Sequence, residues 1–221
     1  MQKYRPFLII AAVLAVAIIG TVRLLKWNRT KDSSTSISSS PSPIGQQPKF
    51  PPGAVVTLEE FGDYQCPPCG ALHPTLKKLK HEFGPNLNFV FRNLPLSSMH
   101  KNALAAAQAA EAARVQERFW EMHDLLYEKQ NLWRDDINPR ATFLKFAGDL
   151  GLDTARFVRD LDDQQVQMRI AADQDAAAKL GINGTPTILI DGRRLRDEVT
   201  TPEGIRKGIE VMMAHKSSPE P

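Results

Sequence analysis

The chain has 221 residues, of which 42% are hydrophobic and 24% are charged, a composition ordinary for a globular protein of one domain with an insertion. Six of the 28 basic residues and one of the 25 acidic residues precede Pro48, so the remainder holds 22 basic and 24 acidic side chains. The net charge of +3 therefore belongs to the N-terminus, and we expect no nucleic-acid partner.

Residues 7–22 carry no charge and have basic residues on both sides, which is typical of a signal-peptide core or a short membrane span. No small-residue cleavage site follows. We therefore expect residues 1–29 to anchor the chain in a membrane through an N-terminal helix, with secretion after signal cleavage as the alternative. The basic residues after this uncharged stretch, taken alone, favour a cytoplasmic location for the rest of the chain. The Ser/Pro-rich stretch 30–50 is interpreted as a flexible linker.

Residues 55–61 are β-branched and apolar and predict a strand. Apolar residues recur at helical spacing from Leu72 to Phe83, and Gly84-Pro85 ends that pattern. Residues 87–92 alternate in polarity and predict a second strand. A strand, a helix and a strand within 40 residues form a βαβ unit, so we expect the two strands to be parallel.

Residues 98–181 contain no convincing strand and are interpreted as an all-helical insertion. Five helices are expected. The first two are the Ala-rich stretch 103–113 and a helix marked by Phe119, His123 and Leu126. The next two begin at caps: Asn138-Pro139, followed by Phe143, Ala147 and Leu150, and Asp153, with Val158 and Leu161 inward. The fifth is lined by Val166, Ile170, Ala177 and Leu180 and ends at Gly181.

Strands return at residues 187–190, where Asp191-Gly192 predicts a tight hairpin turn and residues 193–196 its partner strand. Thr201 is expected to cap a final helix with Ile205, Ile209 and Met212 inward. The order β-α-β, helical insertion, β-β-α defines an α/β chain. Its main domain is expected at 51–97 and 182–215, the insertion at 98–181 and a disordered tail at 216–221.

Cys66 and Cys69, the only cysteines, are separated by two prolines. Haem attachment requires His after the second Cys, but Gly70 is there. Zinc requires four ligands, and although His73 is near in sequence no second cluster follows, so we expect no metal. A structural disulfide across two residues closes too short a loop to stabilise much.

Thiol–disulfide exchange accounts for the pair better. Cys66 lies where a strand gives way to a helix, whose free N–H groups and dipole favour a thiolate. Cys69, one turn further, is placed to close the ring. Pro67 and Pro68 fit the first helical turn. Neither donates a backbone hydrogen bond to sulfur, which limits the fall in the pKa of Cys66.

The second motif is Gly184-Thr185-Pro186-Thr187, just before a strand. Pro186 is either an ordinary edge-strand proline or a cis proline in a tight turn. The second alternative leaves the backbone of Thr185 available to pair with an extended substrate peptide.

Taken together, the motifs resemble the DsbA-like thiol:disulfide oxidoreductase family of the thioredoxin superfamily, over about residues 50–215. The matching segments are F-x-D-x-x-C-P-x-C (61–69), R-N-L-P-L (92–96) with His100, F-W-x-x-H-D (119–124), L-G-L-D (150–153), and G-T-P-T (184–187) followed by Asp191-Gly192. The resemblance implies a thioredoxin fold with a helical insertion. The N-terminal anchor resembles that of membrane-tethered members.

The resemblance also implies individual roles. Cys66 is expected to be the exposed, substrate-facing cysteine and Cys69 its buried partner. Pro186 is expected to be a cis proline facing the disulfide, and Thr185, Pro67 and Pro68 to contact substrate.

Glu60 matches an acidic residue beneath the active site, a proton acceptor for Cys69; a solvated strand-end carboxylate is the alternative. His100 and His123 match family positions and are interpreted as helix and packing features. Strongly oxidising members have His where this chain has Pro68, which argues against a very high redox potential.

The sequence therefore predicts a membrane-tethered, extracytoplasmic dithiol oxidase with no cofactor beyond its own disulfide. Its expected partners are unfolded or extended thiol-containing proteins and a membrane protein that reoxidises it. An oxidising compartment is required for this reaction, which overrides the charge-based orientation. A disulfide reductase or isomerase is the alternative, and a redox-inert peptide-binding domain is the third.

Overall fold

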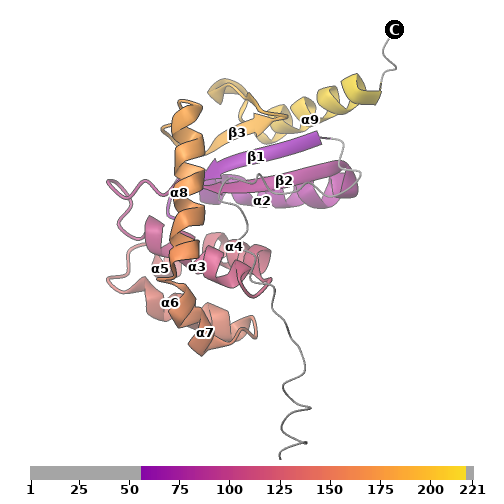
Figure 1. The fold of residues 1–221 in the computed structure, drawn as a ribbon. Helices are drawn as coiled ribbons and strands as arrows, with labels where there is room; N and C mark the ends of the chain where they lie inside the picture. The colour runs from indigo at the N-terminus through magenta and orange to yellow at the C-terminus, as the bar shows by residue number, and fades with distance from the viewer. Residues whose placement is uncertain (1–55, 218–221) are drawn as a thin grey trace, which may run out of the picture. The chain divides into compact units, whose positions relative to one another are not determined.

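The computed structural model describes residues 56–217 (Figure 1). The predicted anchor at 1–29 and linker at 30–50 lie outside these residues and stay predictions. None of the helices between residues 56 and 217 has the length and apolar character needed to cross a membrane.

The strands are β1 (Val56–Gly62), β2 (Leu87–Asn93), β3 (Thr187–Ile190) and β4 (Arg193–Arg194). The helices are α2 (Pro67–Phe83), α3 (Ala103–Arg114), α4 (Phe119–Glu128), α5 (Gln130–Trp133), α6 (Pro139–Asp149), α7 (Thr154–Asp160), α8 (Gln164–Lys179) and α9 (Pro202–Ser217).

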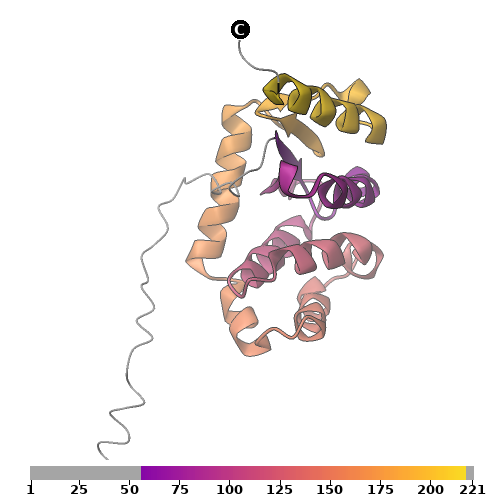
Figure 2. The ribbon, with the colours of Figure 1, turned by 90° about the vertical axis from the view of Figure 1, so that its right-hand side faces the viewer.

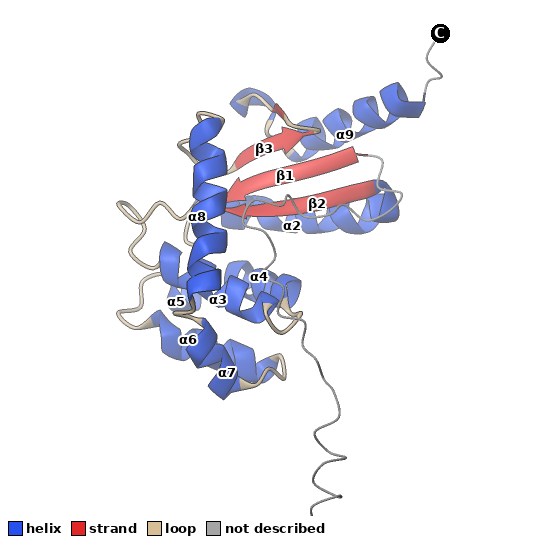
Figure 3. Ribbon diagram, in the orientation of Figure 1, coloured by secondary structure: helices blue, strands red, loops and turns tan. Residues whose placement is uncertain are grey.

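The four strands form one mixed sheet in the order β2-β1-β3-β4 (Figure 3). β1 and β2 are parallel, which confirms the predicted βαβ unit, whereas β3 runs antiparallel to both β1 and β4. With its helices, this sheet is the thioredoxin fold that the sequence predicted.

The hairpin between β3 and β4 turns at Asp191 and Gly192, whose φ angles of 47° and 74° confirm the predicted tight turn. The partner strand was expected over 193–196 but ends at residue 194. Leu195 still donates one backbone hydrogen bond to Ile188, at 2.8 Å. Its side chain packs into the core beneath the sheet, so the chain bends into a short 3₁₀ turn at 197–199.

Side chains of β1 alternate between the two faces of the sheet. Val56 and Leu58 pack with α2 and α9, whereas Phe61 packs on the other face with Ala177 of α8. Figure 2 shows α8 on the opposite side of the sheet from α2 and α9. By the same alternation Glu60 lies on the α2 face, the face on which the cysteine-bearing helix packs.

Residues 98–181 contain no strand, and the five predicted helices are present, with a short α5 that the sequence pattern did not indicate. Ala106, Ala109, Ala110 and Ala113 of α3 are fully buried in the core of this helical region. Because these side chains are so small, neighbouring helices can approach α3 closely.

Two inward-facing residues were predicted wrongly. Val158 is 48% exposed, because Phe157 and Leu161, four residues apart, share the buried face of α7. Leu180 is 54% exposed because it follows the last turn of α8, where the chain turns away at Gly181.

Two of the three predicted helix caps are present. The side chain of Asp153 accepts from the N–H of Arg156 at 2.9 Å, and that of Thr201 from the N–H of Gly204 at 3.1 Å. Asn138 precedes α6 but its side chain caps nothing. Helix α9 continues to Ser217, two residues into the expected tail; residues 218–221 are not described.

Candidate active site

Cys66 is the residue from which α2 begins, after a three-residue loop that follows β1. Its backbone is extended (φ −68°, ψ 122°), and its side chain makes no capping bond to the helix. Pro67 and Pro68 fill the first two helical positions, as predicted, and both are exposed. At these positions a missing N–H breaks no helical hydrogen bond.

Both cysteines are free thiols and both are buried, with 5% of Cys66 and none of Cys69 exposed. Burial of Cys69 was expected, but an exposed Cys66 was not found. Cys66 is covered by the Gly184–Thr187 motif, whose Thr185 carbonyl oxygen lies 3.5 Å from the Cys66 sulfur. The Thr185-Pro186 peptide bond is cis, which decides between the two interpretations of Pro186.

The two sulfur atoms have opposite electrostatic environments. The hydrogen bond from the Cys69 thiol is the largest influence on Cys66 and, helped by the Thr185 side chain and a backbone N–H, lowers the pKa of Cys66 to about 6. Burial and the charge of Asp63 oppose this shift. Burial raises the pKa of Cys69 well above the ordinary value. At neutral pH the pair therefore holds one thiolate, on Cys66.

Glu60 is 1% exposed, which excludes the alternative of a solvated strand-end carboxylate. One of its carboxyl oxygens is buried without a hydrogen-bond partner among the described residues. Burial, with a smaller contribution from the charge of Cys66, raises the pKa of Glu60 to about 8. Glu60 in turn raises the pKa of Cys69 electrostatically, so the carboxyl and the buried thiol influence each other. A carboxyl with this pKa can hold or release a proton near neutral pH.

Asp63, which sequence reasoning passed over, organises the loop before Cys66. One carboxyl oxygen accepts from the N–H of Gln65 at 2.7 Å, and the other bonds the N–H of Leu96 at 2.9 Å and Nδ1 of His100 at 2.8 Å. His100 lies before α3 rather than in a helix, so its interpretation as a helix feature was wrong. The only sequence signal was the conspicuous F-x-D spacing before the cysteines.

The helical region holds this same loop from the other side. The side chain of Gln130 donates to the carbonyl oxygens of Tyr64 and Cys66, at 2.7 and 3.1 Å. Gln65 donates to the carbonyl oxygen of Arg134 at 2.6 Å and accepts from the N–H of Asn102 at 2.7 Å. Sequence reasoning missed these polar residues as well, because their partners are far away in sequence.

Comparison with known proteins agrees with this geometry. A sequence profile described as thioredoxin matches residues 51–211. The chain belongs to the thioredoxin family. A thioredoxin-like oxidoreductase from Silicibacter pomeroyi is 28% identical, with a TM-score of 0.63 over 76% of this chain and 91% of that one. BdbD from Bacillus subtilis is 25% identical, with a TM-score of 0.65 over 74% and 90%.

The fold is also that of more distant DsbA-like proteins. The thiol-disulfide exchange protein α-DsbA2 from Wolbachia pipientis, at 20% identity, has a TM-score of 0.63 over 73% of this chain and 84% of that one. The chain is thus a thioredoxin-family protein that shares its fold with these DsbA-like proteins.

Other relatives are longer proteins that are named as sodium/proton antiporters. A protein named Na⁺/H⁺ antiporter NhaA 1 from Salinispora arenicola is 44% identical over 144 residues, which are 65% of this chain but 21% of that protein. A second, from Herminiimonas arsenicoxydans, is 32% identical over 84% of this chain and 29% of its own length. The chain spans under a third of either relative, so their name describes proteins with much sequence outside the match.

Proposed function

We propose that the protein is a dithiol oxidase that introduces disulfides into other proteins through Cys66 and Cys69. The observation that carries the proposal is the opposite shift of the two thiol pKa values. A thiolate stabilised at Cys66 stabilises the reduced form, and stabilising the reduced form makes the disulfide a better oxidant.

The reaction begins when a substrate thiolate attacks the Cys66 sulfur of the oxidised pair. The Cys66–Cys69 bond breaks, a mixed disulfide forms between substrate and Cys66, and Cys69 leaves with the electron pair. Glu60, protonated at neutral pH because its pKa is about 8, supplies the proton that Cys69 requires. A second substrate thiolate then attacks the substrate sulfur and releases Cys66 as a thiolate. Two electrons pass from substrate to enzyme, and no bound cofactor takes part.

Substrates are proposed to be extended, thiol-containing segments of unfolded proteins. Such a segment would lie across the Thr185-Pro186 backbone beside the sulfur, with Pro67 and Pro68 forming the exposed border of the site. Cys66 is 5% exposed, so little of its side chain is open to a substrate. Reoxidation requires a redox partner, proposed to lie in the membrane.

The proposed location is outside the cytoplasm, because reducing systems in the cytoplasm oppose disulfide formation. Attachment through residues 7–22 remains part of the proposal and rests on sequence alone.

A reductase role is the second candidate, and one observation favours it. A Cys66 pKa of about 6 lies nearer to the about 7 of thioredoxin than to the about 3.5 of DsbA. Pro67 and Pro68 account for this moderate shift, because neither brings an N–H group to the start of α2.

Equilibration of the full-length chain against glutathione mixtures distinguishes the two roles. An oxidase is expected to have a potential more positive than the about −230 mV of glutaredoxins, whereas a value near the about −270 mV of thioredoxin would exclude it. In parallel, the oxidised chain is incubated with a reduced, unfolded substrate protein and the loss of substrate thiols is counted. Cys66→Ser is expected to abolish the reaction; peptide binding that survives this change without any thiol loss would indicate a redox-inert binding domain.

A further inference from the structure

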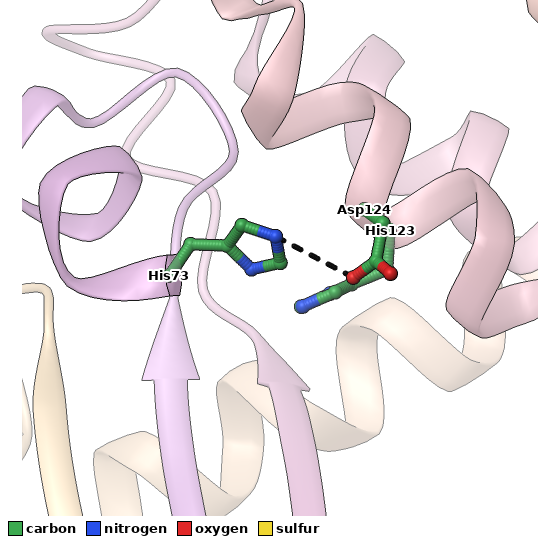
Figure 4. A group of neighbouring side chains, drawn as sticks. All are labelled: His73, His123 and Asp124. Carbon is green, nitrogen blue, oxygen red and sulfur yellow. Dashed lines mark ion pairs between the residues drawn. The ribbon is translucent and has the colours of Figure 1, made fainter. Parts of the chain in front are cut away.

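A second cluster of titratable side chains lies between α2 and α4 (Figure 4). His73 comes from α2, and His123 and Asp124 are neighbours on α4. One nitrogen or oxygen atom from each of the three residues lies within 4.8 Å of the others. The proposed thiol chemistry uses none of these residues.

Both imidazoles in the cluster have a buried, unsatisfied nitrogen. His73 is 4% and His123 1% exposed, and Nε2 of each has no hydrogen-bond partner among the described residues. Leaving such a nitrogen unpaired costs free energy, because the nitrogen loses its hydrogen bonds to water without replacement. Nε2 of His73 faces Oδ1 of Asp124, and two unpaired nitrogens on rings beside one carboxylate indicate that something else completes the group.

The spacing of one pair of atoms in the cluster suits a metal ion. Nε2 of His73 is 3.4 Å from Oδ1 of Asp124, which is longer than an ordinary N–H···O hydrogen bond. Two ligands of a tetrahedral zinc ion with bonds of about 2.0 Å are separated by about 3.3 Å. The two atoms therefore stand at the separation that a shared ion requires.

The hydrogen bonding of His123 also suits a metal. Nδ1 of His123 lies 3.0 Å from the hydroxyl oxygen of Tyr64. Donation of Nδ1–H to that oxygen leaves the lone pair on Nε2, as in many zinc sites whose histidines are oriented by a second hydrogen bond.

An ion can reach the cluster, because the three residues line a cavity of about 430 Å³ and Asp124 is 29% exposed. Lys77 is the main opposing feature, with its Nζ 2.8 Å from the other carboxyl oxygen of Asp124. Lys77 is 50% exposed and also pairs with Glu128, so its ammonium can remain at the surface when an ion binds. Lys80, which also lines the cavity, lies over the ring of Trp120.

We propose that His73, His123 and Asp124 bind a divalent zinc ion, with water as the fourth ligand. Two imidazoles and one carboxylate are a ligand set that zinc accepts in open sites. The proposal departs from the expectation that the chain has no metal site. It also differs from the zinc arrangement considered from sequence, because it uses His73 without either cysteine.

The test is a calorimetric titration of the full-length chain with Zn²⁺, after removal of metals with a chelator. The chain is first oxidised, so that Cys66 and Cys69 are tied in a disulfide and cannot bind the ion. We expect one ion per chain. Asp124→Asn is expected to weaken binding about 100-fold, whereas His81→Gln, an exposed histidine that lines the same cavity, is expected to change nothing. Lys77→Gln removes the competing cation and is expected to tighten binding about two- to fivefold.

His73→Gln is a fourth variant and is also expected to weaken binding, with circular dichroism to verify that it is folded. Cobalt is used as a spectroscopic probe, because a four-coordinate Co²⁺ ion absorbs visible light far more strongly than a six-coordinate one. Two results would overturn the proposal. One is the absence of zinc binding by the oxidised wild-type chain. The other is binding that Asp124→Asn leaves unchanged; if His81→Gln abolishes that binding, the ion lies on a surface histidine.

Discussion

Replacing Cys69 with alanine tests how the structure activates Cys66. The thiol of Cys69 is the largest influence that lowers the pKa of Cys66, ahead of the Thr185 side chain and a backbone N–H group. Alanine removes that donor and leaves the backbone of α2 in place. Burial and the charge of Asp63, which both raise the pKa, then offset the donors that remain. We therefore expect the pKa of Cys66 to rise toward the value of about 8.5 for an unperturbed cysteine.

The size of the effect follows from these values. With a pKa of about 6, roughly nine-tenths of Cys66 is thiolate at neutral pH. With a pKa of about 8.5 the fraction falls to about 3%. The free-energy difference is about 3 kcal/mol, since one pKa unit corresponds to about 1.4 kcal/mol.

The ultraviolet absorbance of the thiolate, followed as a function of pH, measures this change directly. Alkylation rates are a weaker readout, because intrinsic nucleophilicity rises with pKa and cancels most of the loss of thiolate. Cys69→Ser is the matched control, since its hydroxyl group can still donate to Cys66 and should preserve most of the low pKa. If alanine and serine both leave the pKa near its original value, the hydrogen bond from Cys69 is not the cause, and the Thr185 side chain and the backbone N–H at the start of α2 must be.

Two further changes test the surroundings of the thiols. Because the pKa of Glu60 is higher in the folded chain than in the unfolded one, its contribution to stability is lost as pH rises from about 4.5 to about 8. In urea unfolding of the oxidised chain, the free energy of unfolding of Glu60→Gln should change less with pH than that of the wild-type chain, by at most about 5 kcal/mol over that range. Plots of this free energy against pH that run parallel for the two proteins would contradict the assignment. Gln130→Ala removes two hydrogen bonds to loop carbonyls and should lower the free energy of unfolding by about 1–3 kcal/mol. An unchanged urea midpoint would mean that these two hydrogen bonds do not stabilise the loop.

Local patterns were sufficient to predict most of the framework. The strand at 56–62 and the helix after the cysteines follow from short-range polarity, and prolines at the first helical positions follow from their missing N–H groups. Errors arose where two apolar residues adjoin. Phe157 and Val158 both fit a helical pattern, and only the packing of α7 against the elements around it decides which of the two is buried.

The candidate site was less predictable, because its decisive contacts join distant parts of the sequence. Burial of Cys66 comes from Thr185, which lies 119 residues further along the chain. Asp63 bonds His100 across 37 residues, and neither has a periodic pattern to mark it. The cysteine spacing therefore indicated the chemistry, but not how the sulfur atoms are held or covered.

The helical region also has a part in the site that its composition did not suggest. A loop that places a reactive sulfur at a helix start has carbonyl groups that no helix or strand can satisfy. Gln130 bonds one such carbonyl, that of Tyr64, and shares the carbonyl of Cys66 with the N–H of Gly70 in α2. Asn102 joins Gln65 to the end of α5 and the residues after it by donating to the carbonyls of Trp133, Arg134 and Asp136. The helical region thus completes the hydrogen bonding of the loop that carries Cys66. The position of the sulfur is consequently set by the sheet and the helical region together, and a change within residues 130–136 should alter the thiol although it touches neither cysteine side chain.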